Sequence, residues 1–238
     1  MMNRRPIGII GAMDIEVDSL KASINNCKSE KVGEMTFFSG SLNGAEVIVV
    51  KCGIGKVNAA RCAQTLADRF LVSAIINTGI GGGIGEGLAV GDIVIGESLV
   101  QHDFDVTGFG YAKGYMFSGD KDKPTQYIAD KELCRNIENA ALKHIPAQRI
   151  KKGIIATGDV FVSDSEKKSE IKNGFNALVT EMEGGAIAQT AQANNVPFAV
   201  VRALSDLADG SAAESYEAFE KETAYLSAEI IKSFLSSI

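Results

Sequence analysis

Carboxylate side chains follow four of the short apolar segments in this sequence. The acids are Glu16, Asp159, the near neighbours Glu181 and Glu183, and Asp206. In an open α/β sheet, ligands bind in the crevice beyond the carboxyl ends of the strands. If the apolar segments are strands of one such sheet, the acids border a common ligand site. A group of carboxylates there is suited to proton transfer and to the stabilisation of positive charge.

Each acid also has a simple structural explanation. Asp14, Asp159 and Asp206 lie at expected strand–helix junctions, where aspartate commonly caps a helix, and capping is the favoured interpretation for Asp159. Glu181 is expected to be a solvated partner of a lysine. The functional hypothesis therefore depends on the whole set and not on any single acid.

The hydrophobic pattern predicts the elements that must position these acids. Apolar runs, most of them without the alternation of a half-exposed strand, are Ile7–Ile10, Glu46–Lys51, Ala74–Asn77, Asp92–Ile95, Gly153–Ala156, Ala177–Val179 and Phe198–Ala203. Amphipathic or alanine-rich runs predict helices at Ile15–Ile24, Val57–Phe70, Lys131–His144, Ser165–Asn173, Glu183–Asn194 and Tyr216–Leu235. Their order predicts an α/β fold: a single domain over residues 1–238, with a central, mixed but mostly parallel twisted sheet flanked by helices.

The glycine run Gly79–Gly85 follows one predicted strand but matches no nucleotide-binding motif. Its spacing fails the dinucleotide pattern G-x-G-x-x-G, and Gly55-Lys56 continues into Val57, which breaks the P-loop pattern. Two interpretations remain equally open. The run is either a tight turn between strands or a backbone that lets a ligand approach closely.

Composition argues against several classes of protein. The 238 residues carry a net charge of −6 and no dense Lys/Arg run, which is unlike a nucleic-acid-binding protein. With two histidines and no C-x-x-C pair among four cysteines, we expect no metal site, and His102–Asp105 is interpreted as a polar turn. The apolar stretch Ile7–Met13 is too short for a signal peptide, and no segment approaches the length of a membrane span. We therefore expect a cytoplasmic protein with free thiols, no cofactor and no membrane partner.

Residues 101–123 form a long expected loop that contains five aromatic side chains. Ordered loops of this length in a compact domain are usually functional. A role at the site or at an interface is favoured over a loop that packs on its own domain or forms an ordinary dimer contact.

Eight short motifs, taken together and in this order, resemble the 5'-methylthioadenosine/S-adenosylhomocysteine nucleosidases of the purine-nucleoside phosphorylase superfamily. They are Ile7–Val17 (IGIIGAMDIEV), Gly53–Val57 (GIGKV), Ile75–Gly79 (IINTG), Val90–Val94 (VGDIV), His102–Tyr111 (HDFDVTGFGY), Thr157–Phe161 (TGDVF), Glu181–Glu183 (EME) and Val201–Asp209 (VRALSDLAD). The resemblance implies a nucleosidase fold and a homodimer. It also implies hydrolysis of the bond between adenine and ribose in both thio-nucleosides, with 5'-deoxyadenosine as a further candidate substrate. The implied role is methionine salvage and adenosylhomocysteine recycling.

The resemblance also implies roles for individual residues. Glu16 lies where the family has the carboxylate that activates water, Asp206 where it has the acid that serves adenine N7, and Glu183 where it has the carboxylate that holds the ribose hydroxyls. Positions implied to contact the adenine nucleoside are Met13, Ile54, Gly82, Val106, Phe109, Phe161, Val162, Met182 and Arg202.

Three of those positions carry a more specific expectation. The ring of Phe161 is implied to stack on adenine, the main chain of Val162 to read the edge of the base, and Arg202 to lie near the water and Glu16. The sequence departs from the family at Ile80-Gly81, where Ser-Ala is common. Either Thr78 or main-chain amides are then expected to replace the serine hydroxyl, or the substrate range differs.

The implied reaction explains why three acids are needed. Adenine is a poor leaving group as an anion, and protonation at N7 makes it neutral, while the ribose passes through a cation-like transition state. An unperturbed aspartic acid has a pKa of about 3.9, so Asp206 needs a shift of about three units, or ~4 kcal/mol, to be protonated near neutral pH. Burial and the neighbouring carboxylates act in that direction. Alternatively, Asp206 stays ionised until the substrate binds.

Three other functions remain open on the sequence. A phosphorylase on the same fold would need a cluster of Arg and Ser/Thr donors for phosphate, which the glycine run does not provide. A nucleoside-binding or storage protein would have no need for the three acids. A hydrolase of another adenine or hypoxanthine nucleoside would differ mainly in the apolar shape around the 5' end of the sugar.

Overall fold

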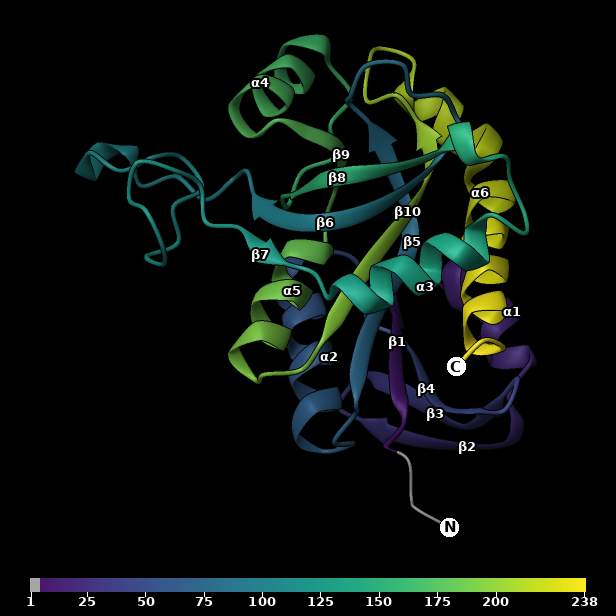
Figure 1. The fold of residues 1–238 in the computed structure, drawn as a ribbon. Helices are drawn as coiled ribbons and strands as arrows, with labels where there is room; N and C mark the ends of the chain where they lie inside the picture. The colour runs from purple at the N-terminus through teal and green to yellow at the C-terminus, as the bar shows by residue number, and fades with distance from the viewer. Residues whose placement is uncertain (1–4) are drawn as a thin grey trace.

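The computed structural model describes residues 5–238, and the chain alternates between strands and helices along its length (Figure 1). The strands are β1 (Ile7–Gly11), β2 (Asn25–Val32), β3 (Met35–Leu42), β4 (Ala45–Lys51), β5 (Ala74–Gly83), β6 (Ile93–Gln101), β7 (Tyr127–Ile128), β8 (Ile150–Thr157), β9 (Ala177–Glu181) and β10 (Phe198–Asp206). The helices are α1 (Asp14–Ala22), α2 (Lys56–Asp68), α3 (Lys131–Ala141), α4 (Ser165–Phe175), α5 (Gly184–Ala193) and α6 (Ala212–Leu235), with 3-10 turns η1 (Thr107–Phe109) and η2 (Ala147–Arg149). The expected α/β class is confirmed.

The strands form one mixed sheet in the order β10-β6-β8-β9-β5-β1-β4-β3-β2, with β7 paired to β6. Strand β10 also pairs with β5, so β5, β9, β8, β6 and β10 close into a ring. The pairs β1–β4, β1–β5, β5–β10, β6–β8 and β8–β9 are parallel. This arrangement brings the ends of β1, β5, β9 and β10 to one region of the sheet.

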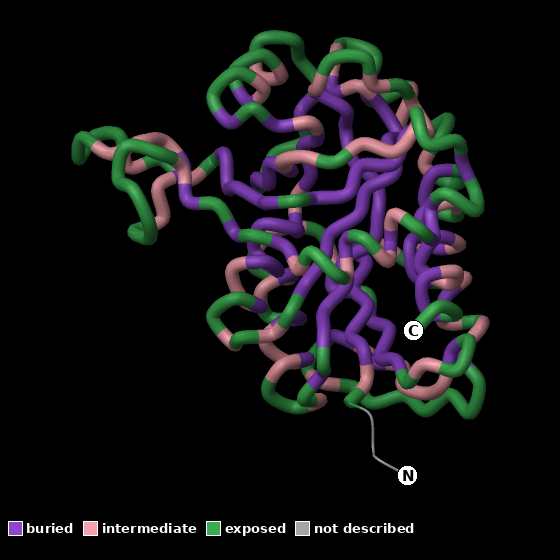
Figure 2. Tube along the Cα trace, in the orientation of Figure 1, coloured by how far each residue is buried: buried purple, intermediate pink, exposed green. Residues whose placement is uncertain are grey.

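Helices cover both faces of the sheet. Helices α2 and α5 pack against each other on one side, while α6 packs on α1, α3, β5 and β10 on the other (Figure 1). The central strands are buried along most of their length (Figure 2) because their side chains meet helices on both faces. Among residues 5–238, no helix is both long and apolar enough to cross a membrane.

Strands β2 and β3 were not expected from the hydrophobic pattern. Strand β2 has the sequence NNCKSEKV and lies at the edge of the sheet with no buried residue. An edge strand needs few apolar side chains, and charged residues there oppose pairing with other chains. A polar strand of this kind leaves no apolar signal in the sequence.

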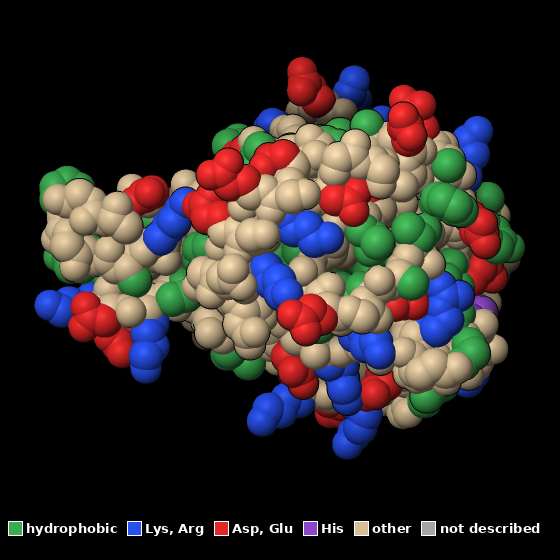
Figure 3. Space-filling view, turned by 90° about the horizontal axis from the view of Figure 1, so that it is seen from above, with side chains coloured by type: hydrophobic (Ala, Val, Ile, Leu, Met, Phe, Trp, Pro, Cys, Tyr) green, Lys and Arg blue, Asp and Glu red, His purple; other side chains and the backbone are tan. Residues whose placement is uncertain are grey.

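After β6 the chain leaves the body of the protein as an arm, which we define as residues 103–126 (Figure 1). Tyr111, Tyr115 and Phe117 pack on one another in the arm, with ring centroids 5.2 to 5.7 Å apart. Hydrophobic side chains are exposed on the arm (Figure 3), where Phe109 is 80% and Phe117 63% exposed. The expected long loop therefore projects from the protein with exposed aromatic side chains, and it also contacts its own domain through the ion pairs Lys56–Asp103 and Lys113–Glu170.

Candidate active site

A cavity of ≈ 480 Å³ lies at the ends of β1, β5, β9 and β10, a volume typical of small-molecule sites. It is lined by Ala12, Met13, Glu16, Ile54, Ile80, Gly81, Gly82, Val160, Phe161, Val162, Thr180, Glu181, Met182, Glu183, Ser205, Asp206, Ala213, Tyr216 and Glu217. Glu16, Glu183 and Asp206 therefore border one cavity, although they are far apart in sequence. Six of the residues implied to contact substrate, namely Met13, Ile54, Gly82, Phe161, Val162 and Met182, also line it.

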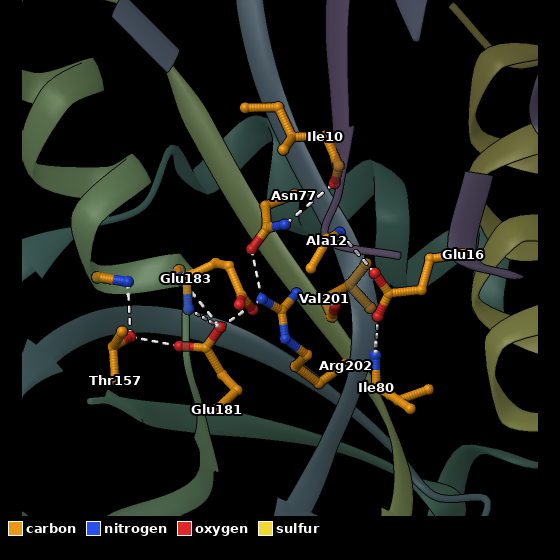
Figure 4. Close-up of polar contacts among 12 residues, drawn as sticks. Ile10, Ala12, Glu16, Asn77, Ile80, Thr157, Glu181, Glu183, Val201 and Arg202 are labelled. Atoms are coloured by element: carbon orange, nitrogen blue, oxygen red, sulfur yellow. Dashed lines mark hydrogen bonds and ion pairs between the residues drawn. The ribbon is translucent and has the colours of Figure 1, made fainter. Parts of the chain in front are cut away.

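Glu16 lies in the first turn of α1 and is 4% exposed. Its carboxylate accepts hydrogen bonds from the main-chain N–H groups of Ala12 at 2.6 Å and Ile80 at 3.1 Å (Figure 4). It also accepts from the N–H of Met13 at 3.0 Å. Burial raises the pKa of Glu16 above its ordinary value, and the three amides and the charge of Arg202 oppose that rise. The carboxylate is thus fixed in position by backbone donors from β5 and from the turn after β1.

The glycine run is part of strand β5, which extends to Gly83, so the interpretation as a tight turn is wrong. A Cβ atom at Gly79 would overlap the Glu16 carboxylate, and one at Gly82 would lie 2.8 Å from Oδ1 of Asp206. Glycine at these positions lets two carboxylates lie directly against the strand. The close approach that the run permits is therefore made by the protein's own acids.

Asp206 ends strand β10 and is 2% exposed. Its Oδ1 accepts from the N–H of Ala208 at 2.8 Å, and its Oδ2 accepts from the hydroxyl of Ser205 at 2.9 Å. Burial raises the pKa of Asp206, while these two hydrogen bonds act against the rise. Asp206 does not cap α6, because that helix begins at Ala212 after Ser211. The shift favours a carboxylic acid that can hold a proton for a ligand.

Glu183 directly precedes helix α5 and is 6% exposed. Its Oε1 accepts a hydrogen bond at 2.8 Å from the N–H of Gly55, the residue before α2. Burial raises the pKa of Glu183 to about 8, and repulsion from Glu181 adds to this effect. The Gly55 amide and the charge of Arg202 favour the carboxylate instead, as does the positive end of the α2 dipole.

Glu181 was expected from the sequence to be a solvated partner of a lysine, and this expectation is wrong. It is 7% exposed and forms an ion pair with Arg202. It also accepts from the N–H groups of Glu183 at 3.0 Å and Gly184 at 2.8 Å, and from the hydroxyl of Thr157 (Figure 4). Glu181 therefore holds the turn that carries Glu183. Its place at the end of an apolar strand was the only sequence signal for this role.

Arg202 is 1% exposed within β10 and does not line the cavity. Its guanidinium donates to Glu181, to the side chain of Asn77 and to the carbonyl of Val201. The resemblance implied that Arg202 lies near Glu16, but the two side chains share no hydrogen bond. Arg202 lowers the pKa of Glu16 through its charge, and its hydrogen bonds go to other groups.

Asp159 caps a helix, but not the one that follows it. Its Oδ1 accepts from the N–H of Lys56 at 2.8 Å, in the first turn of α2. Asp14, in contrast, caps no helix, since its carboxylate pairs with Lys51 and Lys21. Lys56 and Lys51 lie far from Asp159 and Asp14 in the sequence, so local sequence patterns cannot reveal these contacts.

Helix α5 begins with two glycines whose amides are both in use. Gly184 donates to Glu181, and Gly185 donates to the hydroxyl of Thr157 at 2.6 Å. A Cβ at Gly185 would lie 2.8 Å from that same hydroxyl oxygen. The glycines, which disfavour a helix, are therefore explained by the close approach of β8 to the turn after β9.

Helix α6 contributes cavity residues that the sequence did not indicate. Tyr216 lies edge-on to Phe161, with ring centroids 6.0 Å apart and an interplanar angle of 84°. Its hydroxyl contacts the sulfur of Met13 at 3.2 Å. The expected helix began at Tyr216, whereas α6 begins one turn earlier at Ala212 and so presents its first turn to the cavity.

The model of the phosphorylase superfamily matches residues 6–237 of this chain. The 5'-methylthioadenosine/S-adenosylhomocysteine nucleosidase of Anoxybacillus flavithermus is 42% identical over 98% of both chains. The chain belongs to this nucleosidase family. The resemblance found in the sequence motifs is thereby confirmed over the full length of the fold.

Two solved structures are also similar to this member of the nucleosidase family. The nucleosidase of Neisseria meningitidis in complex with methylthio-immucillin-A has a TM-score of 0.91 and 37% identity, covering 98% of this chain and 100% of the other. The futalosine hydrolase of Helicobacter pylori has the same TM-score at 30% identity, covering 98% of each chain. The fold is thus shared with a nucleosidase and with a futalosine hydrolase.

Ile80 is the main departure from the nucleosidase family at this site. Its main-chain N–H donates to Glu16 at 3.1 Å. A serine here would carry the same amide, so this bond does not replace the serine hydroxyl. Thr78 does not compensate, because its hydroxyl is bonded to that of Ser227 on α6 at 2.7 Å. The side chain of Ile80 is 8% exposed and adds apolar surface to the cavity wall.

Val106 and Phe109 are implied contact residues that, like Arg202, do not line the cavity. Both belong to the arm, and neither lines the cavity of a single chain of this nucleosidase family member. Phe109 is 80% exposed. Within one chain, the structure does not bring these two side chains to the three acids.

Proposed function

We propose that this chain is an N-glycosidase that hydrolyses 5'-methylthioadenosine and S-adenosylhomocysteine to adenine and a thioribose product. The observation that carries the proposal is the convergence of Glu16, Glu183 and Asp206 on one cavity. The 42% identity to a nucleosidase of that name over nearly the whole chain supports the same substrates. Methionine salvage and adenosylhomocysteine recycling are the processes this reaction serves.

Asp206 is the proposed general acid. Its buried carboxyl group, with its raised pKa, shares or donates a proton to adenine N7, so that the base departs as a neutral molecule. Ser205 and the Ala208 amide hold the carboxyl group in one orientation. Because only a group protonated at working pH can give up a proton, the upward shift has the sign that the role needs.

Glu16 and Glu183 serve the sugar. Glu16 accepts the proton of the attacking water, and its three backbone donors favour the carboxylate against the effect of burial. Glu183 holds the ribose hydroxyls and places negative charge beside the cation-like transition state. As positive charge develops on the ribose, it favours the ionised form of Glu183 and offsets the raised pKa of that group.

Water is the proposed nucleophile in preference to phosphate. Ile80, Gly81 and Gly82 have no side-chain donors for an anion, and the Glu16 carboxylate beside them would repel one. Arg202 is already committed to Glu181 and Asn77. The arrangement thus suits a neutral nucleophile that needs a base.

A homodimer is proposed as the working form. The exposed aromatic side chains of the arm, Phe109 and Phe117, provide apolar surface that a second copy would cover. In such a dimer, the arm's Val106 and Phe109 would complete the 5' end of the partner's nucleoside site. This arrangement accounts for the two implied contact residues of the arm, neither of which lines the cavity of its own chain.

The proposed activity is tested by measuring adenine release from purified protein by chromatography, with and without phosphate. We expect equal release in both buffers from methylthioadenosine and adenosylhomocysteine, and a free thioribose as the second product. Release that requires phosphate would establish a phosphorylase instead. Tight binding of methylthioadenosine in a calorimeter, with no adenine released, would establish a binding protein.

The preferred 5' substituent is tested with the same assay on methylthioadenosine, adenosylhomocysteine and 5'-deoxyadenosine. The wall formed by Met13, Ile54 and Tyr216 is largely apolar, so we expect the thioethers to have the higher kcat/KM. A preference for futalosine over all three would place the chain's activity with the hydrolase that is 30% identical.

Replacing Gly79 with alanine is expected to lower kcat/KM by about 100-fold. The new Cβ would overlap the Glu16 carboxylate and force it to move, and a displacement of about 1 Å of a catalytic group costs roughly this much. Gly174→Ala on α4 is the matched control, because no atom lies within 4 Å of a Cβ at that position. Parental kcat/KM in the Gly79→Ala variant would contradict the assignment of Glu16 as the base.

A further inference from the structure

Asp103, the first residue of the arm, links three separate segments of the chain. Its Oδ1 accepts from Nζ of Lys56 at 2.7 Å, and its Oδ2 accepts from the main-chain N–H of Asp159 at 2.9 Å. The side chains of Lys56 and Asp103 are 18% and 26% exposed, so this ion pair is partly shielded from water. The arm, the start of α2 and the loop after β8 therefore meet at one carboxylate.

A third contact closes these groups into a ring. Oδ1 of Asp159 accepts from the main-chain N–H of Lys56 at 2.8 Å. Lys56 is thus held at both its side chain and its backbone, as the first residue of α2. We call Asp103, Lys56 and Asp159 the clamp.

The clamp is one residue away from the group that holds Glu183. The N–H of Gly55 donates to Oε1 of Glu183 at 2.8 Å. Gly55 has φ 97°, a conformation that favours glycine, and a Cβ there would lie 3.1 Å from Oδ1 of Asp159. The position of this amide is therefore set by the position of Lys56 and Asp159.

The clamp also reaches the other side of the cavity. Asp159 is followed directly by Val160, Phe161 and Val162, all of which line the cavity. The hydrogen bond from the Asp159 amide to Asp103 fixes the start of that segment. One carboxylate thus anchors both the donor to Glu183 and the segment that bears Phe161.

The charges around Asp103 leave Lys56 as its direct ionic partner. The adjacent His102 is buried, and burial lowers its pKa to about 4, so it is uncharged at neutral pH. The hydrogen bonds from Lys56 and the Asp159 amide hold the pKa of Asp103 below its ordinary value against the effect of burial. The Asp103 carboxylate therefore stays ionised throughout the neutral range.

We propose that Asp103 is a positioning residue for Glu183, the carboxylate that holds the ribose hydroxyls. Through Lys56 and Asp159, Asp103 fixes the Gly55 amide that donates to Glu183. The proposal deepens the proposed nucleosidase function and rests on it. It assigns a role in the site to a residue of the arm that does not itself line the cavity.

The test is a double-mutant cycle with Asp103→Asn, Lys56→Met and both changes together, with kcat and KM measured on methylthioadenosine. We expect each single variant to lose about tenfold in kcat/KM. The double variant is expected to lose about tenfold as well, because the effects of substitutions within one network are not additive. Asp18→Asn is the matched control. Asp18 also pairs with a lysine, Lys21, at 2.7 Å, but its side chain is 64% exposed on α1, and we expect kcat/KM within twofold of the parent.

The pH profile separates positioning from a general loss of structure. A looser Gly55 amide stabilises the Glu183 carboxylate less, so the pKa of Glu183 rises. We assign the ascending limb of kcat/KM to the ionisation of Glu183. This limb is then expected to move to higher pH in Asp103→Asn and to stay in place in Asp18→Asn. An unmoved limb, or additive losses in the cycle, would overturn the proposal.

Amide hydrogen exchange followed by mass spectrometry tests the clamp independently of turnover. We expect faster exchange at residues 54–58 in Asp103→Asn than in the parent or in Asp18→Asn. If the parent releases adenine but exchange and kinetics are the same in all three proteins, the positioning role is wrong. If the parent releases no adenine, the proposed function fails, and the exchange result alone decides whether the clamp exists.

Discussion

The Asp206→Asn variant is expected to turn over methylthioadenosine about 1000-fold more slowly than the parent. General acid catalysis contributes roughly 100- to 10,000-fold, and asparagine can donate a hydrogen bond to N7 but cannot transfer a proton. Because asparagine has nearly the same shape, we expect the affinity for the substrate to change little. The measurement is kcat in steady state together with the dissociation constant from calorimetry. Activity within tenfold of the parent would rule out Asp206 as the acid.

The same variant is expected to be at least as stable as the parent at pH 7. Burial raises the pKa of Asp206 in the folded state, so the native protein binds more protons than the unfolded chain as pH rises above the unfolded pKa of about 3.9. Stability is therefore lost with rising pH through the folded pKa, and a neutral asparagine removes that cost. Urea denaturation at pH 7 checks this point, and it separates a lost proton donor from a lost fold.

The second large effect is expected in stability. Glu181→Gln leaves the guanidinium of Arg202, which is 1% exposed, without its ionic partner. Breaking a buried pair by removing one charge typically costs about 3–5 kcal/mol. We expect a decrease of that size in the free energy of unfolding, measured by urea denaturation. A loss below about 1 kcal/mol would show that Glu181 does not compensate the buried cation.

A surface pair provides the matched control for Glu181. Glu170 pairs with Lys113 and Lys167 but is 45% exposed at its side chain. Exposed pairs contribute about 0–1 kcal/mol, because water already solvates both charges. Glu170→Gln removes the same kind of charge and is expected to change the free energy of unfolding by no more than this amount.

The sequence predicted the buried strands and all six helices well, because their signals are local. An apolar run such as Phe198–Ala203 can only be stable if it is covered on both faces, and β10 spans it. The polar edge strand β2 carries no such signal. The glycine run was open to two interpretations, because its reason lies in the Glu16 and Asp206 carboxylates that pack on it from other elements.

The candidate site was predicted in its acids but not in their partners. Glu16, Glu183 and Asp206 were identified from their place after strands and from the family motifs, and they border one cavity. The burial of Glu181 and its pairing with Arg202 depend on the packing of β9 against its neighbours, which no local pattern encodes. Tyr216 was missed for a similar reason, since its contact with Met13 joins opposite ends of the chain.

A crystal structure of the Asp206→Asn variant bound to intact methylthioadenosine tests the central claim most directly. We expect the side chain at position 206 within hydrogen-bond distance of adenine N7, Glu183 on the ribose hydroxyls, and a water held by Glu16 on the opposite face of the sugar. A nucleoside bound outside the cavity, or with its base turned away from position 206, would contradict the account.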